Sequence, residues 1–184
     1  MNKYIALLRG INVSGQKKIK MSDLKLHFES IGFTNIQTYI QSGNIVFCSK
    51  LKNVSKIKES IENKILEVYN FSVPTMILTK PKLEKTMNGN PFNLDTIDFS
   101  KVAITFLESV QKNNSVENIK KFKVKIEEFV ISEDVIYLYC PNGFGRTKLT
   151  NNLFETKLKV TATTRNWKTS NKLLEMISET NCGK

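Results

Sequence analysis

The sequence predicts an α+β protein built from two modules of the same topology. Short apolar runs of strand length alternate with amphipathic stretches of helical spacing, and this order occurs twice along the chain. Between residues 79 and 100 the periodicity weakens, and Pro, Gly and Asn accumulate. A chain of 184 residues has room for two small modules on either side of such a stretch.

The first expected module covers residues 1–80. Tyr4 to Leu8 form a continuous apolar run, which suits a buried strand. Apolar side chains then recur at helical spacing over residues 21–31. Ser22 is the expected N-cap of this helix, and Gly32 is its expected stop signal. The module therefore begins with a strand followed by a helix.

A hairpin, a helix and a last strand are expected next. Residues 35–40 and 45–48 are strand-like and flank a turn signal at residues 42–44. Residues 54–68 carry an apolar stripe, with lysines and glutamates elsewhere on the same helix. Residues 73–78 are again strand-like. The resulting β-α-β-β-α-β order is that of the ferredoxin-like split βαβ fold.

A linker over residues 81–100 is expected to lead to a second ferredoxin-like module over residues 101–184. This half repeats the order of elements and ends in an extra C-terminal helix. No repeat is visible residue by residue, so the expected duplication is one of topology. The expected strands are 102–107, 125–131, 135–140 and 160–164, and the expected helices are 116–122, 149–158 and one around residues 173–177.

Cysteine and histidine usage argues against a structural zinc site. Cys48, Cys140 and Cys182 are far apart, no CxxC pair exists, and His27 is the single histidine. Cys48 and Cys140 each end an apolar run, where a thiol is usually a small buried hydrophobe. We therefore expect reduced thiols in a cytoplasmic protein without metal or cofactor. Neither a signal peptide nor a membrane-spanning run is recognisable.

The formal net charge of +11 suggests phosphate-bearing or acidic partners. Residues 1–92 carry 14 basic and 6 acidic side chains, and residues 138–172 carry seven basic side chains and one acidic. The basicity is thus concentrated in the first module and in one later stretch. Lysine and asparagine are abundant throughout, so part of the charge is a compositional background that serves solubility.

The first candidate binding segment is the loop between the first strand and the first helix. Such a loop presents backbone amides to an anion. Its Gly10-x4-Gly15 spacing resembles a P-loop, but Gln16-Lys17-Lys18 replaces the residues that nucleotide hydrolysis requires. The loop is either a flexible turn with solvated lysines or a phosphate site. The candidate phosphate ligands are Arg9, Lys17, Lys18 and Lys20.

Three further segments are candidates for nucleic-acid contact. The turn after residue 39 is sufficiently explained as a hairpin, although its side chains also suit hydrogen bonding to a base. Residues 161–172 combine the single tryptophan with cations, as a base-stacking surface requires, whereas tryptophan also serves as core. Residues 141–148 form a basic glycine-rich loop. The candidates in these segments are Tyr39, Asn44, Arg146, Lys148, Arg165, Asn166, Trp167 and Lys168.

The segments ALLRGINVSG, IKMSDL, TYIQSGNIVF and TTRNWKT resemble a bacterial family known only as the domain of unknown function DUF1697. Ser14 and Lys168 stand where that family commonly has glycine and asparagine. The resemblance implies a two-part α+β fold and a bacterial cytoplasmic protein, but no established reaction. The signature positions that it singles out are Arg9, Gly10, Asn12, Met21, Tyr39, Ser42, Gly43, Asn44, Arg165, Asn166 and Trp167.

Nucleic-acid binding is the function that the sequence favours, with a single-stranded or RNA-like ligand held by basic loops and a cleft between the modules. The aromatic motif of RNA-recognition modules is absent, and Ile45-Val46-Phe47-Cys48 stands there instead. We assign no catalytic residue, because no acidic cluster lies near the basic loops. The alternatives are an enzyme or binder that acts on a nucleotide or phosphorylated metabolite, and an interaction module without a phosphate ligand. The oligomeric state stays open.

Overall fold

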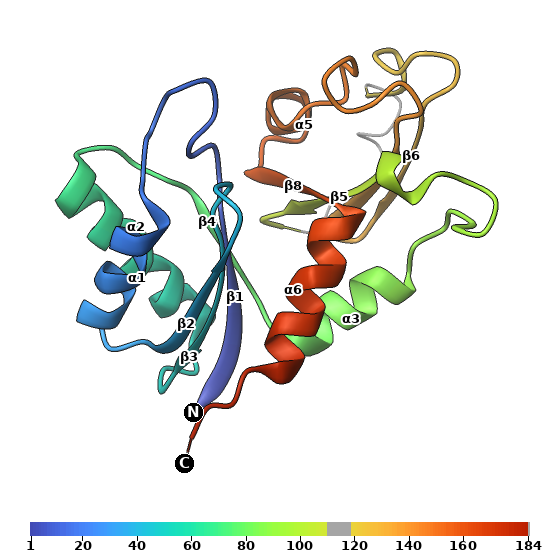
Figure 1. The fold of residues 1–184 in the computed structure, drawn as a ribbon. Helices are drawn as coiled ribbons and strands as arrows, with labels where there is room; N and C mark the ends of the chain where they lie inside the picture. The colour runs from blue at the N-terminus through green and yellow to red at the C-terminus, as the bar shows by residue number, and fades with distance from the viewer. Residues whose placement is uncertain (110–118, 184) are drawn as a thin grey trace. The chain divides into compact units, whose positions relative to one another are not determined.

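The computed structural model describes residues 1–109 and 119–183, and its chain divides into two compact units (Figure 1). Unit 1 contains Met1–Glu84 together with Lys172–Lys184, and unit 2 contains Lys85–Asn171. The expected division into residues 1–80, 81–100 and 101–184 places the chain's last residues in the second module. In the structure these residues belong to unit 1, because the chain returns there after completing unit 2.

Unit 1 contains a four-stranded antiparallel sheet with the strand order β2-β3-β1-β4. Its central strand β3 is buried at every position, and its edge strand β2 is largely exposed. The expected strands of residues 1–80 are therefore present, with bounds shifted by a few residues. They are β1 (Asn2–Leu8), β2 (Thr34–Tyr39), β3 (Asn44–Ser49) and β4 (Thr75–Leu78).

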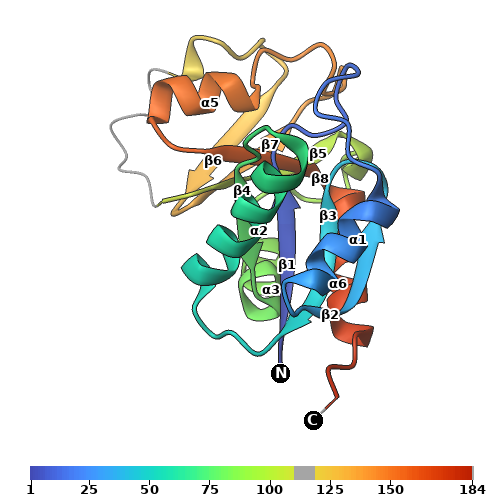
Figure 2. The same cartoon turned by 90° about the vertical axis from the view of Figure 1, so that its left-hand side faces the viewer.

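Helices α1 (Met21–Ser30) and α2 (Val54–Tyr69) pack on one face of this sheet (Figures 1 and 2). Alternate β1 side chains point to that face, where they meet Phe28 of α1 and the isoleucine stripe of α2. The expected N-cap Ser22 is wrong, because Lys20 occupies the N-cap position with an extended backbone and no side-chain cap. The hydroxyl of Ser22 donates to Asp23 instead, at 3.0 Å.

Helix α6 (Trp167–Glu179) returns the chain to unit 1, where a disulfide joins Cys48 of β3 to Cys182. The expectation of three reduced thiols is therefore corrected for two of them, and Cys140 is the free cysteine. The two bonded residues are separated by 134 positions in the sequence. Because only the fold brings the two cysteines close together, no local sequence pattern predicts the disulfide.

Unit 2 holds a second four-stranded antiparallel sheet, in the order β6-β7-β5-β8. Helix α5 (Asn151–Leu158) covers one face of it through Phe154 and Leu158. Part of the helix expected over 116–122 lies outside the described residues. The remaining elements are α3 (Lys80–Asn88), which begins in unit 1, η1 (Phe99–Lys101), β5 (Val102–Leu107), β6 (Glu128–Ser132), β7 (Val135–Tyr139) and β8 (Ala162–Asn166).

Each unit contains an equivalent hydrogen bond between a glutamate on a helix and the first residue of the next strand. In unit 1 the carboxylate of Glu62 on α2 accepts from the amide of Thr75, the first residue of β4, at 2.7 Å. In unit 2 the carboxylate of Glu155 on α5 accepts from the amide of Ala162, the first residue of β8, at 3.1 Å. The same kind of hydrogen bond thus anchors α2 to β4 and α5 to β8. The fold is α+β, with two four-stranded antiparallel sheets and five α-helices among the described residues.

Candidate functional site

The loop between β1 and α1 is held in a defined conformation by hydrogen bonds of the Asn12 side-chain amide. The side-chain Nδ2 of Asn12 donates to the carbonyl of Ile19 at 2.9 Å and to the carbonyl of Gln41 at 2.8 Å. Its Oδ1 accepts from the amide of Ile19 at 2.9 Å. The backbone of Asn12 is left-handed, with φ 54°, a conformation that asparagine tolerates better than most residues. One side chain therefore closes the loop and ties it to the hairpin turn.

The turn between β2 and β3 reaches the same place because Gly43 lies against the end of β1. Its carbonyl accepts from the amide of Leu8 at 2.8 Å. A Cβ at Gly43 would lie 2.6 Å from the Cβ of Leu8, and the glycine has φ +74°. Only glycine fits this approach. Two of the candidate segments, the loop and the turn, are therefore brought together within unit 1.

An open pocket of about 410 Å³ lies where these two segments meet the start of α1. Lys18 and Lys20 are exposed at its rim, and neither forms an ion pair with any residue that the structure describes. Asp23 contributes one negative charge to the same pocket. The pocket is lined by Asn12, Lys18, Ile19, Lys20, Asp23, Gln41 and Tyr69.

The N-terminus of α1 opens at this pocket. Lys20 and Asp23, which flank the first turn, both line it, and no side chain caps the helix. Uncapped first-turn amides and the helix dipole favour a bound anion. Two lysines that form no ion pair within the described part of the chain and one helix terminus thus act on the same space, with Asp23 opposing them. The arrangement suits a ligand that carries a negative group beside a hydrogen-bond donor.

Tyr69, at the end of α2, is one of the residues that line this pocket. Its hydroxyl is buried and has no hydrogen-bond partner among the described residues. Burial, and after it the charge of Asp23, raises the pKa of Tyr69 above its ordinary value. The hydroxyl therefore stays protonated and able to donate. The ring is held by an edge-on contact with His27, at 5.5 Å between centroids, so this histidine serves packing.

The other candidates in unit 1 are engaged in the fold. The ammonium group of Lys17 donates to the carbonyl of Ser72 at 2.7 Å and does not line the pocket. Asn44 is fully buried, and its amide donates to the carbonyl of Tyr39 at 3.1 Å and to the hydroxyl of Ser42 at 2.9 Å. Arg9 and Tyr39 are partly buried, and the amide of Arg9 donates to the carbonyl of Pro74 at 2.8 Å.

The candidates of the later segments lie in unit 2 and divide into buried and exposed groups. Arg165 and Trp167 are each only 8% exposed, and Arg165 donates to the carbonyl of Thr164 at 2.9 Å. The side-chain oxygen of Asn166 accepts from the amide of Thr169 at 2.8 Å, at the start of α6. The candidates whose side chains are exposed, with no ion pair in the described part of the chain, are Arg146, Lys148 and Lys168.

Sequence reasoning missed Asp23 and Tyr69 as lining residues. Tyr69 follows Ile61 and Ile65 at the helical spacing of four, so the α2 stripe already placed it on the inner face. Asp23 stands in the first turn of α1, where a carboxylate is common for reasons of helix stability alone. The apolar stripe could have identified Tyr69, whereas nothing in the local pattern distinguished Asp23.

Cys140, the free thiol, is expected to be inert as a nucleophile. It is fully buried, and burial raises the pKa of its thiol from 9.0 to about 11. The neutral form is therefore favoured in the folded state, and stability contributed by this group is complete below the ordinary pKa and declines as the pH rises from 9.0 toward 11. Iodoacetamide at about pH 8, followed by mass spectrometry, should label no cysteine of the folded, oxidised protein. Labelling of Cys140 at the rate of a model thiol would contradict this assignment.

No group of three or more His, Cys, Asp or Glu side chains within residues 1–109 and 119–183 is arranged to hold a metal ion. None of the helices described is long and apolar enough to cross a membrane.

Comparison with known proteins identifies relatives but no activity. A family model described as a protein of unknown function, DUF1697, matches residues 1–137. A search of curated proteins found no match. A solved structure, that of the conserved bacterial protein SP0830 from Streptococcus pneumoniae, is similar with a TM-score of 0.75 and 24% sequence identity. The similarity covers 95% of this chain and 98% of that one, so it supports the fold over nearly the full length of both.

Proposed function

Because the chain belongs to the DUF1697 family, whose description assigns no activity, we propose a function from the site alone: the pocket between the β1–α1 loop and α1 binds a small phosphorylated ligand. The ligand class is a nucleotide or a phosphorylated metabolite. The proposal concerns binding and assigns no reaction.

The observation that carries this proposal is the pairing of Lys18 and Lys20 with the uncapped start of α1. Two lysines without an ion pair to any described residue, beside a helix start that no side chain caps, form an anion site of the kind that holds phosphate groups, although Asp23 lines the same pocket. The pocket of about 410 Å³ falls in the range of small-ligand sites, which is roughly 300–1,000 Å³. Asn12 keeps the loop in place before a ligand arrives, so little ordering is needed on binding.

The remaining lining groups indicate that the proposed ligand also carries a hydrogen-bonding group beside its phosphate. The Asp23 carboxylate accepts hydrogen bonds, and the protonated Tyr69 hydroxyl is without a partner among the described residues. Both suit a hydroxyl or amino group placed next to the phosphate. A bare polyanion leaves Asp23 facing negative charge without compensation, whereas a ligand with a sugar or amine beside its phosphate does not.

Nucleic-acid binding is the second candidate. It is favoured by Arg146, Lys148 and Lys168 of unit 2, which are exposed and form no ion pair with a described residue. The burial of Trp167 and Asn44 removes two of the groups that would contact bases. We therefore rank this function below the binding of a small phosphorylated ligand. The form of nucleic-acid binding that is still compatible with these burials is contact between the exposed cations and the phosphate backbone, independent of the bases.

A finer proposal concerns the fold. We propose that both units are ferredoxin-like modules, because each has an antiparallel sheet with the middle-strand order that this fold requires. The shared Glu62 and Glu155 hydrogen bonds support a common topology.

The Lys18→Ala plus Lys20→Ala double variant should lose affinity for a phosphorylated ligand by at least about a hundredfold, since it removes two charge-assisted hydrogen bonds that contribute about 1.5–3 kcal/mol each. The ligand is found first by thermal shift of the wild-type protein against inorganic phosphate, pyrophosphate, adenosine phosphates and sugar phosphates. Calorimetric titration of the best of these probes then compares the variants.

The matched control is Lys50→Ala plus Lys52→Ala, which removes the same charge from exposed lysines of unit 1 outside the pocket. The proposal expects this control to bind like the wild type. Equal loss in both double variants, together with a steep fall in affinity for a single-stranded oligonucleotide as salt is added, would instead support the nucleic-acid candidate. If neither the panel nor the oligonucleotide binds, the pocket is not a phosphate site.

A further inference from the structure

We propose that the Cys48–Cys182 disulfide is a redox-controlled latch that holds the C-terminal tail, residues 180–183, against strand β2. A dithiol reductant then releases the tail and opens the pocket that the tail helps to line. The inference concerns unit 1 alone and does not depend on the phosphate site. It rests on the path of the tail, on the shape of β2 and on the unequal exposure of the two cysteines.

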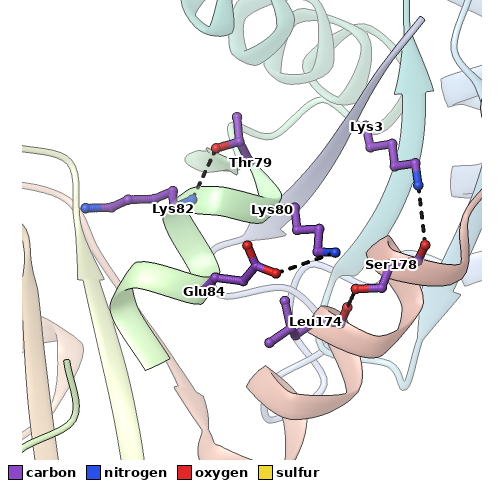
Figure 3. Close-up of polar contacts among 7 residues, drawn as sticks. All are labelled: Lys3, Thr79, Lys80, Lys82, Glu84, Leu174 and Ser178. Atoms are coloured by element: carbon purple, nitrogen blue, oxygen red, sulfur yellow. Dashed lines mark hydrogen bonds and ion pairs between the residues drawn. The ribbon is translucent and has the colours of Figure 1, made fainter. Parts of the chain in front are cut away.

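The end of α6, from which the tail departs, is fixed by hydrogen bonds within the helix and by one contact with β1. The hydroxyl of Ser178 donates to the carbonyl of Leu174 at 2.7 Å, and the carbonyl of Ser178 accepts from the ammonium group of Lys3 on β1 at 3.4 Å (Figure 3). The amide of Thr180 donates to the carbonyl of Met176 at 2.9 Å, and its hydroxyl donates to the same carbonyl at 2.7 Å. Thr180 is 2% exposed, so the chain is still packed where the tail begins.

Strand β2 is shaped to meet the tail. The register of β2 with β3 shifts between Thr34 and Gln37, and within this bulge Asn35 has a left-handed backbone, with φ 49°. The amide nitrogen of Asn35 donates to the carbonyl of Asn181 at 2.6 Å and lies 3.8 Å from the sulfur of Cys48. Gln37 adds a longer hydrogen bond to the hydroxyl of Thr180, at 3.4 Å. The bulge thus directs a side chain to the residue before Cys182.

The tail forms one wall of a polar pocket of about 380 Å³. The opposite wall comes from α1 and β2, which is the edge strand of its sheet. When the tail leaves, the pocket loses that wall, and the side chains of Asn35 and Gln37 on β2 lose their hydrogen-bond partners. The lining residues on the side of the tail are Glu179, Thr180 and Asn181.

The two cysteines differ in access. Cys48 lies on the buried strand β3 and has no exposed surface, whereas Cys182 is partly exposed. One thiolate of the reductant attacks the sulfur of Cys182, the bond to Cys48 breaks, and Cys48 leaves as a thiolate that takes up a proton. The second thiolate of the reductant displaces Cys182 from the mixed disulfide, and Cys182 takes up the second proton. The dithiol ends as its own disulfide, so two electrons have passed to the protein.

The hydrogen bonds that hold the tail are weaker than the disulfide. Hydrogen bonds of exposed groups such as Asn35 and Asn181 compete with water and hold the tail only weakly. The disulfide therefore decides whether the last residues stay in place. In a reducing compartment, disulfides that do form are usually transient and redox-sensing, which fits a latch rather than a permanent staple.

The test is hydrogen exchange by mass spectrometry on the full chain, with the oxidised protein compared with protein reduced by dithiothreitol. Reduction should make the amides of β2 and of residues 180–183 exchange at least about tenfold faster. Strand β4, the opposite edge of the same sheet, is the internal control and should not change. The Cys182→Ser variant should behave as the reduced protein under both conditions, and Cys140→Ser should keep the wild-type response.

Three results would overturn the latch. One is a protein that keeps three free thiols after exposure to an oxidant. The second is exchange at β2 and the tail that is equal in the oxidised and reduced wild-type protein. The third is acceleration of β2 and β4 alike, because this means that reduction destabilises the whole unit rather than releasing its tail. The wild-type comparison decides all three even where a cysteine variant fails to fold.

Discussion

The Gly43→Ala substitution is expected to lower the free energy of unfolding by roughly 2–5 kcal/mol. Two costs add together. A residue with a Cβ is strained at φ +74°, and the new methyl group would lie 2.6 Å from the Cβ of Leu8 and 3.0 Å from a methyl group of Ile11. Leu8 and Ile11 are both buried, so neither can move aside without disturbing the core. Urea denaturation of the wild type and the variant measures the difference.

The matched control is Gly15→Ala, in the loop between β1 and α1. Gly15 has nearly the same backbone, with φ +76°, but a Cβ there meets nothing within 4 Å. This control carries the backbone strain alone, about 1–2 kcal/mol. A larger loss for Gly43→Ala than for Gly15→Ala isolates the contact with β1. Equal losses in the two variants would mean that the turn relaxes and that its approach to Leu8 is not tight.

This comparison also shows what the sequence could and could not predict. The turn at residues 42–44 follows from the local pattern of Ser-Gly-Asn between two strand-like runs, and the structure has a hairpin there. That Gly43 must be glycine because it lies against Leu8 depends on β1 pairing with β3. Such pairing joins residues far apart in the sequence, and local spacing carries no information about it.

The cysteines make the same point more strongly. The apolar run before Cys48 correctly indicates a buried side chain on β3. Its partner Cys182 follows α6, and only the return of the chain from unit 2 to unit 1 brings the two sulfurs together. The prediction that residues 101–184 form one module places Cys48 and Cys182 in different modules. The prediction of reduced thiols therefore failed together with the assignment of the last residues to the second module.

Charge and hydrogen-bonding type predicted only part of the pocket lining. Lys18 and Lys20, which the sequence predicts as phosphate ligands, line the pocket, and their role as ligands stays a prediction. Asn12, Asn44 and Asn166 carry the same amide that a ligand-binding residue needs, but each amide serves its own loop, hairpin or helix start. Polar residues at turns and caps stabilise backbone far more often than they bind ligands, and the sequence alone does not separate the two uses.

Asn12 provides the most direct test of how this pocket is preorganised. Replacing Asn12 by glycine removes its side-chain hydrogen bonds to Ile19 and Gln41 while keeping a backbone that accepts φ 54°. At about 1 kcal/mol for each hydrogen bond, the expected loss of unfolding free energy is roughly 2–3 kcal/mol. Asn12→Ala adds backbone strain of about 1–2 kcal/mol to the same loss. Urea denaturation of the two variants separates the hydrogen bonds from the strain.

Hydrogen exchange locates the effect, because the loop and the turn should open together. With Asn12→Gly, amides of the loop over residues 10–20 and of the turn around Gln41 should exchange faster, while the core strands of unit 2 keep their protection. A stability equal to that of the wild type would contradict the role given to Asn12, since its three hydrogen bonds would then contribute nothing net. Faster exchange in the loop without any change at the turn would show that the bond to Gln41 does not couple them. The lysines of the pocket would then stand on a loop that moves independently of the hairpin, and a ligand would have to order that loop as it binds.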